Sequence, residues 1–199
     1  MKTIFDKLFS LVAISLLSPI FVSIFLVLLY PTEFSPFFVQ ERIGYKGRKF
    51  KMYKFRTMRK NAEKELENIL KKNPLLQKEW SENFKLKDDP RIIPFGKFLR
   101  KTSLDELPQL FNVLKGDMSI VGPRPIVTEE VSKYGKSFEF YKLVKPGITG
   151  LWQVSGRSRL SYKERVRLDK KYISECSFKL DLIILFKTIL NLLKGGDGF

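Results

Sequence analysis

The chain has 199 residues, 44% apolar and 29% charged, which indicates a folded globular protein and excludes an intrinsically disordered one. It has no histidine and one cysteine, Cys176, so an internal disulfide is impossible and a zinc site is not expected. A lone cysteine also fits a reducing, cytoplasmic environment. The formal net charge of +16 predicts a polyanionic partner, namely nucleic acid, anionic lipid headgroups or phosphorylated substrates.

An apolar run without a charged residue extends over positions 8–30, which is long enough to cross a bilayer. Lys2 and Lys7 before the run favour a cytoplasmic N-terminus. Nine basic residues and no acid lie within positions 42–60, and they favour the cytoplasm as well. Both preferences are met if the run enters and leaves the membrane on the same face.

The dipeptide Ser18-Pro19 lies at the middle of this run. Proline removes a backbone hydrogen bond and clashes with the preceding turn, so the helix is expected to bend or break there. The hydroxyl of Ser15 or Ser18 would form hydrogen bonds with the backbone groups that the proline leaves without partners. We therefore predict a re-entrant membrane helix–break–helix over residues 1–33 and a cytoplasmic domain over residues 34–199. A kinked single span and a cleaved signal peptide are the alternatives.

The rest of the chain predicts a mainly helical α+β domain with a short sheet and amphipathic helices at the membrane interface. Residues 37–58 have the composition of extended structure around a turn bracketed by Gly44 and Gly47. Residues 61–87 show helical spacing of apolar side chains, with a break expected at Pro74.

The spacing of apolar residues predicts four further elements. The first is a helix from about residue 107 to a cap at Gly116, and the second is a buried strand over 118–121. The other two are helices over 159–174 and 178–193. The last helix carries too many charges to span a bilayer. It is expected to lie in the membrane interface or to pack in the core. Asp88, before the first of these elements, is interpreted as part of a turn rather than as a metal ligand.

Two adjacent carboxylates, Asp105 and Glu106, stand at the start of the helix that ends at Gly116. In a chain without histidine they are the best candidates for acid–base or nucleophilic chemistry. Ser103 and Glu106 also match a capping box, which would make the acids helix-starting devices. Pro108 argues against the cap, because proline prefers the first turn of a helix and places its start after the acids. Spacing alone leaves both interpretations open.

The charges around Asp105 are expected to favour its ionised form. The positive end of the following helix and the guanidinium of Arg100 both act in this direction. An ionised carboxylate is what nucleophilic attack requires. The many basic residues of the chain provide groups that can hold a phosphorylated substrate beside it.

Two further segments carry arginines. Pro123 and Pro125 stiffen the backbone around Arg124, whose guanidinium is either presented to an anion or simply solvated. The glycine-rich segment 145–157 ends on Arg157. Its glycines either let a ligand approach the backbone or shape turns, and the segment lacks the ending of a Walker loop.

Five motifs occur in order along the chain, and they are Tyr-Lys-Phe-Arg-Thr-Met at 53–58, Leu-Asp-Glu-Leu-Pro-Gln-Leu at 104–110, Lys-Gly-Asp-Met-Ser at 115–119, Gly-Pro-Arg-Pro at 122–125, and Pro-Gly-Ile-Thr-Gly-Leu-Trp-Gln-Val-Ser-Gly-Arg at 146–157. Together they resemble the bacterial monotopic phosphoglycosyl transferases, also called bacterial sugar transferases. The resemblance covers essentially the whole chain. It is greatest to the undecaprenyl-phosphate galactose or glucose phosphotransferases.

The resemblance implies a reaction. Asp105 would attack the β-phosphate of a UDP-sugar, UMP would leave, and the phosphosugar–aspartate intermediate would pass to undecaprenyl phosphate. Glu106 would be the partner carboxylate, and Mg²⁺ held by the two acids would neutralise the diphosphate. The residues expected to bind phosphate or nucleotide are Arg100, Pro123, Arg124 and Arg157. Asp169 matches a family acid whose role stays open.

The resemblance also implies a monotopic protein of the bacterial inner membrane that faces the cytoplasm, binds anionic lipids and begins a surface polysaccharide or glycan. A homodimer is left open, and nucleic acid is not an expected partner. From the residues alone, three other functions compete. They are a tethered nucleic-acid-binding module, a basic scaffold without catalysis, and a retaining glycosidase. Adjacent acids fit the glycosidase poorly, because its carboxyl groups stand about 5 Å apart across a sugar bond.

Overall fold

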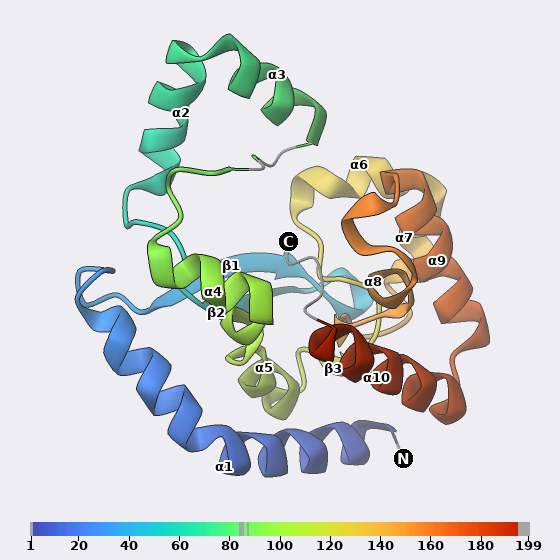
Figure 1. Ribbon diagram of the computed structural model, residues 1–199. Helices are drawn as coiled ribbons and strands as arrows, with labels where there is room; N and C mark the ends of the chain where they lie inside the picture. The colour runs from blue at the N-terminus through green and yellow to red at the C-terminus, as the bar shows by residue number, and fades with distance from the viewer. Residues whose placement is uncertain (1, 84–85, 87, 195–199) are drawn as a thin grey trace.

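A computed structural model describes residues 2–83, 86 and 88–194. The helices are α1 (Lys2–Leu29), α2 (Ala62–Lys72), α3 (Pro74–Asn83), α4 (Pro94–Thr102), α5 (Gln109–Lys115), α6 (Val131–Tyr134), α7 (Phe138–Tyr141), α8 (Leu151–Ser155), α9 (Tyr162–Glu175) and α10 (Phe178–Leu193). The strands are β1 (Phe37–Ile43), β2 (Lys49–Phe55), β3 (Ser119–Val121) and β4 (Gly147–Thr149). This mainly helical α+β fold confirms the predicted class (Figure 1).

Helix α1 contains the apolar run, and within the described residues it alone is long and apolar enough to cross a membrane. It continues through Pro19, so the predicted break at Ser18-Pro19 is wrong, and Figure 1 shows a bent helix instead. The Ser18 hydroxyl donates to the carbonyl of Ser15 at 2.8 Å. Since Pro19 has no N–H for that carbonyl, the serine replaces the lost bond and the helix bends without breaking.

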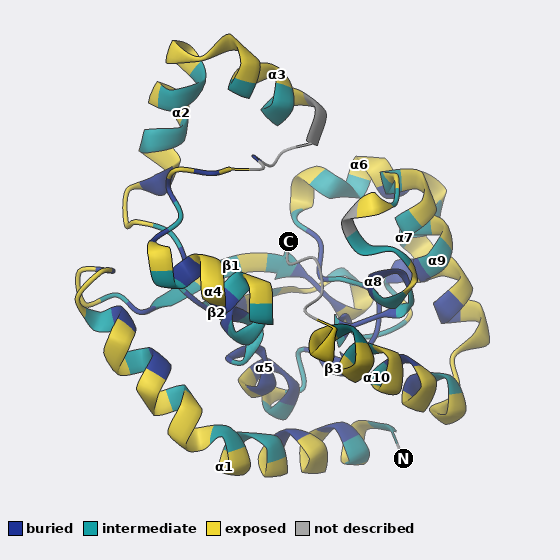
Figure 2. Cartoon of the chain, in the orientation of Figure 1, coloured by how far each residue is buried: buried dark blue, intermediate teal, exposed yellow. Residues whose placement is uncertain are grey.

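One side of α1 is docked on the rest of the molecule. Ile24 and Leu28 join Phe55 and other side chains in a buried hydrophobic cluster. Near the N-terminus, the buried carboxylate of Asp6 accepts a hydrogen bond of 2.8 Å from the hydroxyl of Ser119. Figure 2 shows that the opposite side of α1 is exposed. The helix therefore presents a long apolar face outwards while it is fixed at both ends.

Strands β1 and β2 pair antiparallel from Phe37↔Phe55 to Ile43↔Lys49, which confirms the predicted hairpin. Alternate side chains of a strand point to opposite faces. Phe37 and Phe55 face α1, where their ring centroids lie 6.2 Å and 4.8 Å from that of Phe21. Phe38, Gln40 and Arg42 of β1 and Lys54 of β2 face the other way and line the cavity described below.

Strand β3 confirms the predicted buried strand and pairs in parallel with β4, which the sequence did not predict. The pairing brings two glycines together. A Cβ atom added to Gly147 would lie 2.1 Å from the backbone nitrogen of Gly122. Only glycine allows this approach of the two backbones, so the glycine-rich segment builds a strand pair as well as turns.

Helix α5 begins after Pro108 and ends at Gly116, whose φ of 89° is left-handed, as predicted. Its buried Asn112 accepts a hydrogen bond of 3.0 Å from the backbone N–H of Tyr53 and donates one of 2.7 Å to the carbonyl of Lys51. These two bonds satisfy backbone groups on the edge of β2 that faces away from β1. They also fix the start of α5, and with it the acidic pair, against the hairpin.

Helices α2 and α3 confirm the predicted break at Pro74 and form an arm that stands apart from the body in Figure 1. The arm is held at its base by the buried side chain of Arg91. This guanidinium pairs with Asp89 at 2.5 Å, donates to the carbonyl of Ala62 at 3.1 Å, and lies 5.4 Å from the ring centre of Trp80. The turn expected around Asp88 is present.

Helices α9 and α10 complete the body, and α10 has the bounds predicted for it. Its buried Asp181 accepts from the hydroxyl of Tyr172 at 2.7 Å and pairs with Lys2 of α1 at 2.5 Å. Other side chains of α10, including Phe186 and Leu193, are exposed. The helix thus packs on the core with one face and leaves an apolar face uncovered.

Candidate active site

Asp105 and Glu106 lie in a 3₁₀ turn, Leu104–Glu106, between α4 and α5. Ser103 before the turn has a left-handed φ of 57°, and its side chain makes no capping hydrogen bond. The capping-box alternative is therefore wrong, and the acids precede the helix as Pro108 predicted. A tight turn fixed between two helices holds both carboxylates in place.

The turn forms part of the wall of a cavity of about 460 Å³, between the β1–β2 hairpin, α4 and the start of α2. Its basic wall residues are Arg42, Lys54, Arg56, Arg59, Lys60, Arg91, Arg100 and Arg124. Its acids are Glu63, Asp105 and Glu106. A wall with this surplus of guanidinium and ammonium groups suits a substrate that carries several phosphates.

Asp105 is 9% exposed, and its pKa is raised to about 6. Burial is the main cause and the negative charge of Glu106 adds to it, while Lys54 and Arg100 act in the opposite direction. The expected effect of Arg100 is thus present, but burial, which the sequence did not indicate, has the larger effect on the pKa of Asp105. Above pH 6 Asp105 is still mostly a carboxylate, and it is a more basic one than usual. Such a group is a better nucleophile than an ordinary aspartate.

Glu106 is in a different environment from its neighbour. Burial alone would raise its pKa, but the charges of Lys54 and Arg124 and hydrogen bonds from Lys54 and Gln109 hold the pKa below its usual value. The Lys54 ammonium lies 2.6 Å from the Glu106 carboxylate. Two adjacent carboxyl groups whose pKa values are pushed apart are suited to separate roles.

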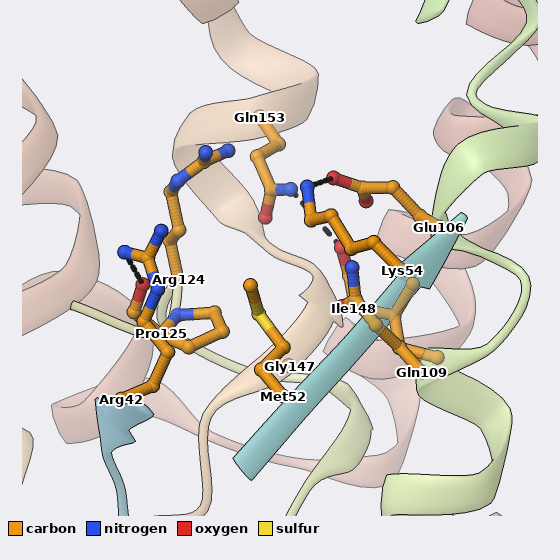
Figure 3. A pocket seen from close by; sticks show the side chains of 10 residues that line it. All are labelled: Arg42, Met52, Lys54, Glu106, Gln109, Arg124, Pro125, Gly147, Ile148 and Gln153. Carbon is orange, nitrogen blue, oxygen red and sulfur yellow. Dashed lines mark hydrogen bonds and ion pairs between the residues drawn. The ribbon is translucent and has the colours of Figure 1, made fainter. Parts of the chain in front are cut away.

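Arg100 and Arg124 both line the cavity beside the acids, as expected of phosphate-binding residues. Arg100 is fixed by a hydrogen bond of 2.9 Å from its Nε to the hydroxyl of Thr57. Arg124 lies 5.9 Å from the ring centre of the buried Trp152. Figure 3 shows a smaller cavity next to the first, with Arg124 on one side and the Lys54–Glu106 pair on the other.

The structure does not bring all of the predicted residues to this cavity. Arg157, whose φ is 51°, donates from Nε to the carbonyl of Gln153 at 3.3 Å and does not line the cavity that contains Asp105. Pro123 does not line it either. The Pro123 carbonyl accepts from the N–H of Gly147 at 2.8 Å, so this proline supports the loop that carries Arg124.

Asp169 also lies outside the cavity, 1% exposed on α9. The hydroxyl of Tyr134 donates to its Oδ2 at 2.7 Å, and its Oδ1 has no partner within the described residues. Burial raises the pKa of Asp169 to about 7, with Tyr134 and Arg124 opposing the shift. This acid joins α9 to α6 and makes no contact with the acidic pair that the structure records.

The model of the bacterial sugar transferase family matches residues 1–195 of the chain. The chain belongs to this family. It is 48% identical over its whole length to the UDP-galactose-lipid carrier transferase of Erwinia amylovora. It is 46% identical over 94% of its length to the exopolysaccharide production protein ExoY of Sinorhizobium fredii. It is 50% identical over 80% of its length to the undecaprenyl-phosphate galactose phosphotransferase of Salmonella typhimurium.

The bacterial sugar transferases in this comparison differ in length. The aligned part is 42% of the Erwinia protein and 33% of the Salmonella protein, but 83% of ExoY. The chain therefore spans less than half of two of these relatives and most of the third.

A magnesium ion, expected from the family resemblance, would have Asp105 and Glu106 as its protein ligands. No group of three or more His, Cys, Asp or Glu suited to a metal occurs in the described part of the chain. Mg²⁺ is commonly held by one or two carboxylates together with substrate phosphates and water. The acidic pair in a cavity suited to phosphates fits that kind of site, although Glu106 already pairs with Lys54.

Sequence reasoning missed two residues of this bacterial sugar transferase site, Lys54 and Arg42. Lys54 lies within the motif at 53–58 that carried the family resemblance, and alternation along a strand places it on the same face as Arg56. Strand alternation could therefore have predicted Lys54 from the sequence. Arg42 reaches the site only because β1 pairs with β2, and nothing in its sequence neighbours indicates this.

Proposed function

We propose that this bacterial sugar transferase moves a sugar 1-phosphate, of galactose or glucose, from a UDP-sugar to undecaprenyl phosphate as the first membrane step in a surface polysaccharide or glycan. One observation carries the proposal: the buried Asp105, with its raised pKa, stands in a cavity lined by basic residues next to the docking site of an apolar helix. The names of the relatives support it, since they include a UDP-galactose-lipid carrier transferase and an undecaprenyl-phosphate galactose phosphotransferase.

In the proposed first half-reaction, an Asp105 carboxylate oxygen attacks the β-phosphorus of the UDP-sugar. A bond forms between this oxygen and phosphorus, and the bond from phosphorus to the UMP oxygen breaks. Arg100, held by Thr57, stabilises the negative charge that develops on the phosphoryl oxygens. Glu106 stays ionised because Lys54 neutralises it.

In the proposed second half-reaction, the phosphate oxygen of undecaprenyl phosphate attacks the same phosphorus. The bond to Asp105 breaks and undecaprenyl-diphosphate-sugar is released. Mg²⁺, when bound, supplies charge neutralisation of the diphosphate. Two displacements through one carboxylate require only one binding cavity, which suits a domain of this size.

The lipid substrate agrees with the position of α1. We propose that α1 enters the inner membrane from the cytoplasmic face and returns to it at its bend, with the exposed apolar side of α10 in the interface and anionic lipids beside the basic surface. The uncovered apolar faces of both helices support this arrangement. A basic scaffold without catalysis is the alternative, but it does not account for two adjacent acids in one cavity whose pKa values are shifted in opposite directions.

The test is a UMP-release assay on purified protein in detergent with magnesium. With UDP-galactose or UDP-glucose and no lipid acceptor, a burst of about one UMP per active site is expected, followed by turnover once undecaprenyl phosphate is added. Asp105→Asn should lose both phases, a loss of at least about a thousandfold for a missing nucleophile. Asp88→Asn, at an exposed turn, is the matched control and should keep them. A burst of unchanged size in Asp105→Asn would refute the assignment.

A further inference from the structure

Two arginines, Arg42 and Arg124, lie at one end of the cavity, and a third, Arg165, lies close to Arg124 without lining the cavity itself. Arg42 and Arg124 line both the large cavity and the smaller one beside it, and Figure 3 shows their side chains on the same side of the smaller one. Arg165 of α9 lies 5.0 Å from the ring centre of Trp152, the indole that Arg124 also faces at 5.9 Å. Two guanidinium groups thus lie against one buried indole, and the third, that of Arg42, is close enough to Arg124 for their charges to interact.

Acidic groups also lie near these arginines. Glu130 lies 3.6 Å from Arg42 and interacts electrostatically with Arg165 as well, and Glu106 interacts electrostatically with Arg42 and Arg124. The positive charge of Arg124 lowers the pKa of both Arg42 and Arg165, although burial is the larger cause in each. Such mutual repulsion between fixed guanidinium groups is relieved when an anion binds between them.

Arg42 is also held rigidly, with part of its donor capacity unused. Its two terminal nitrogens donate to the carbonyl of Pro125 at 3.0 Å and to the side chain of Gln40 at 2.6 Å. Its Nε is buried and has no partner within the described residues. A preorganised guanidinium with a spare donor can bind a phosphate without losing much side-chain entropy.

The cluster lies at the end of the cavity that is remote from α1. Phe37, at the start of β1, contacts Phe21 and Phe25 of α1, whereas Arg42 comes five residues later, about 17 Å along the strand. On α9, Tyr172 belongs to the hydrophobic cluster against which α1 packs, and Arg165 precedes it by seven residues, about 10 Å along the helix. Arg100 is at the opposite end, because its neighbour Leu99 packs with α1.

We infer that Arg42, Arg124 and Arg165 form a subsite for the phosphate of the nucleoside monophosphate that leaves, while the end of the cavity near α1 and Arg100 receives the lipid phosphate. This inference rests on the proposed function, and what it adds is the roles of Arg42 and Arg165 and the direction in which the two substrates lie. A water-soluble nucleotide enters from the side away from the membrane. The phosphate of a membrane lipid reaches the cavity from the side of α1.

The experiment measures UMP binding by calorimetry on the full chain in detergent, which requires no turnover, together with the KM for undecaprenyl phosphate. Arg165→Gln and Arg42→Lys should each weaken UMP binding about tenfold, the loss expected for one charge-assisted phosphate contact. Both should leave the KM for the lipid within about twofold of the wild-type value. Arg167→Gln removes the same charge from an exposed position of α9 and is the matched control, with UMP binding unchanged.

The outcomes separate this inference from the proposed function. Unchanged UMP binding in both variants overturns the subsite, and so does a raised KM for the lipid with UMP binding intact. If the wild-type protein binds UMP but produces no UMP from a UDP-sugar, the proposed function fails while the nucleotide subsite stands. If UMP is released but does not bind measurably, the subsite fails while the function stands. Thermal unfolding of Arg42→Lys and Arg165→Gln identifies any variant that is misfolded.

Discussion

At the position of Asp105, burial and charge move the pKa in opposite directions, and burial has the larger effect. The nearness of Arg100 in the sequence indicated only the effect of its positive charge on the pKa of Asp105. The depth of the side chain depends on the packing of α4, the 3₁₀ turn and the hairpin, and none of these contacts is local in sequence. The same packing gives Glu106 a lysine partner 52 residues away. The sequence could therefore single out the acidic pair as a candidate site, but it could not predict the electrostatic state of the two acids.

Lys54→Met is predicted to change the pH dependence of phosphoryl transfer. The positive charge of Lys54 lowers the pKa of both Asp105 and Glu106, so its loss raises both values. In the proposed mechanism ionised Asp105 is the attacking form, so the rate should fall as the pH drops through about 6 in the wild-type protein. In the variant this fall should begin at a higher pH. The rate of the UMP burst between pH 5 and 8 measures the shift.

The matched control for Lys54→Met is Lys51→Met, an exposed lysine on the other face of the same strand, which should keep the wild-type profile. An acid limb at the same pH in Lys54→Met and in the wild-type protein would contradict the role given to this lysine.

The buried Asp169 is expected to make the free energy of unfolding depend on pH. The pKa of its buried carboxyl group is raised to about 7, well above that of an aspartate in the unfolded chain, so folding favours the protonated form. Its contribution to the free energy of unfolding is complete below pH 4 and is lost as the pH rises to about 7. Asp169→Asn cannot ionise and keeps an oxygen for the Tyr134 hydroxyl.

The stability of Asp169→Asn relative to the wild-type protein should therefore rise between pH 5 and pH 8, by roughly 2 kcal/mol or more. Urea unfolding at the two pH values measures this. A relative stability that does not change with pH would show that Asp169 is not protonated in the folded protein near neutrality.

Among the elements, those with a repeated apolar pattern were predicted well and those fixed by distant backbone contacts were not. α10 has its predicted bounds, and the breaks or ends at Pro74 and Gly116 are where these residues indicated. β4 was missed because three residues next to glycines carry no periodic signal, and its pairing with β3 comes from residues far away in sequence. At Pro19 the sequence indicated a disturbance, and the structure shows a continuous helix in which the Ser18 hydroxyl donates to the Ser15 carbonyl that the proline leaves without its usual partner.

Gly147→Ala tests the importance of the β3–β4 contact. The added Cβ would lie 2.1 Å from the backbone nitrogen of Gly122, so the two backbones must move apart. We expect a loss of about 3 kcal/mol or more in the free energy of unfolding, measured by urea denaturation. Gly44→Ala is the control, since its Cβ meets the movable ring of Phe50 at 3.1 Å, and it should cost about 1 kcal/mol or less. Equal losses in the two variants would contradict this explanation.

For the whole molecule, the central structural proposal is that both ends of α1 lie on one side of the membrane. Single cysteines at Thr3 and at Ser35, introduced after the exposed Cys176 has been replaced by serine, should react with an impermeant maleimide from the same side of sealed vesicles. The bend at Pro19 and the docking of both ends of α1 on one domain are the physical reasons. Labelling from opposite sides would show that α1 spans the bilayer.

The residue to which the sugar phosphate becomes attached tests the proposed mechanism most directly. Purified protein is mixed with UDP-galactose and magnesium without a lipid acceptor, quenched and digested with trypsin, and the peptide over residues 102–115 is fragmented in a mass spectrometer. One hexose-phosphate group is expected on Asp105, absent in Asp105→Asn and present in the Asp88→Asn control. Attachment to Glu106, or release of UMP with no modified residue anywhere in the chain, would contradict the proposed mechanism.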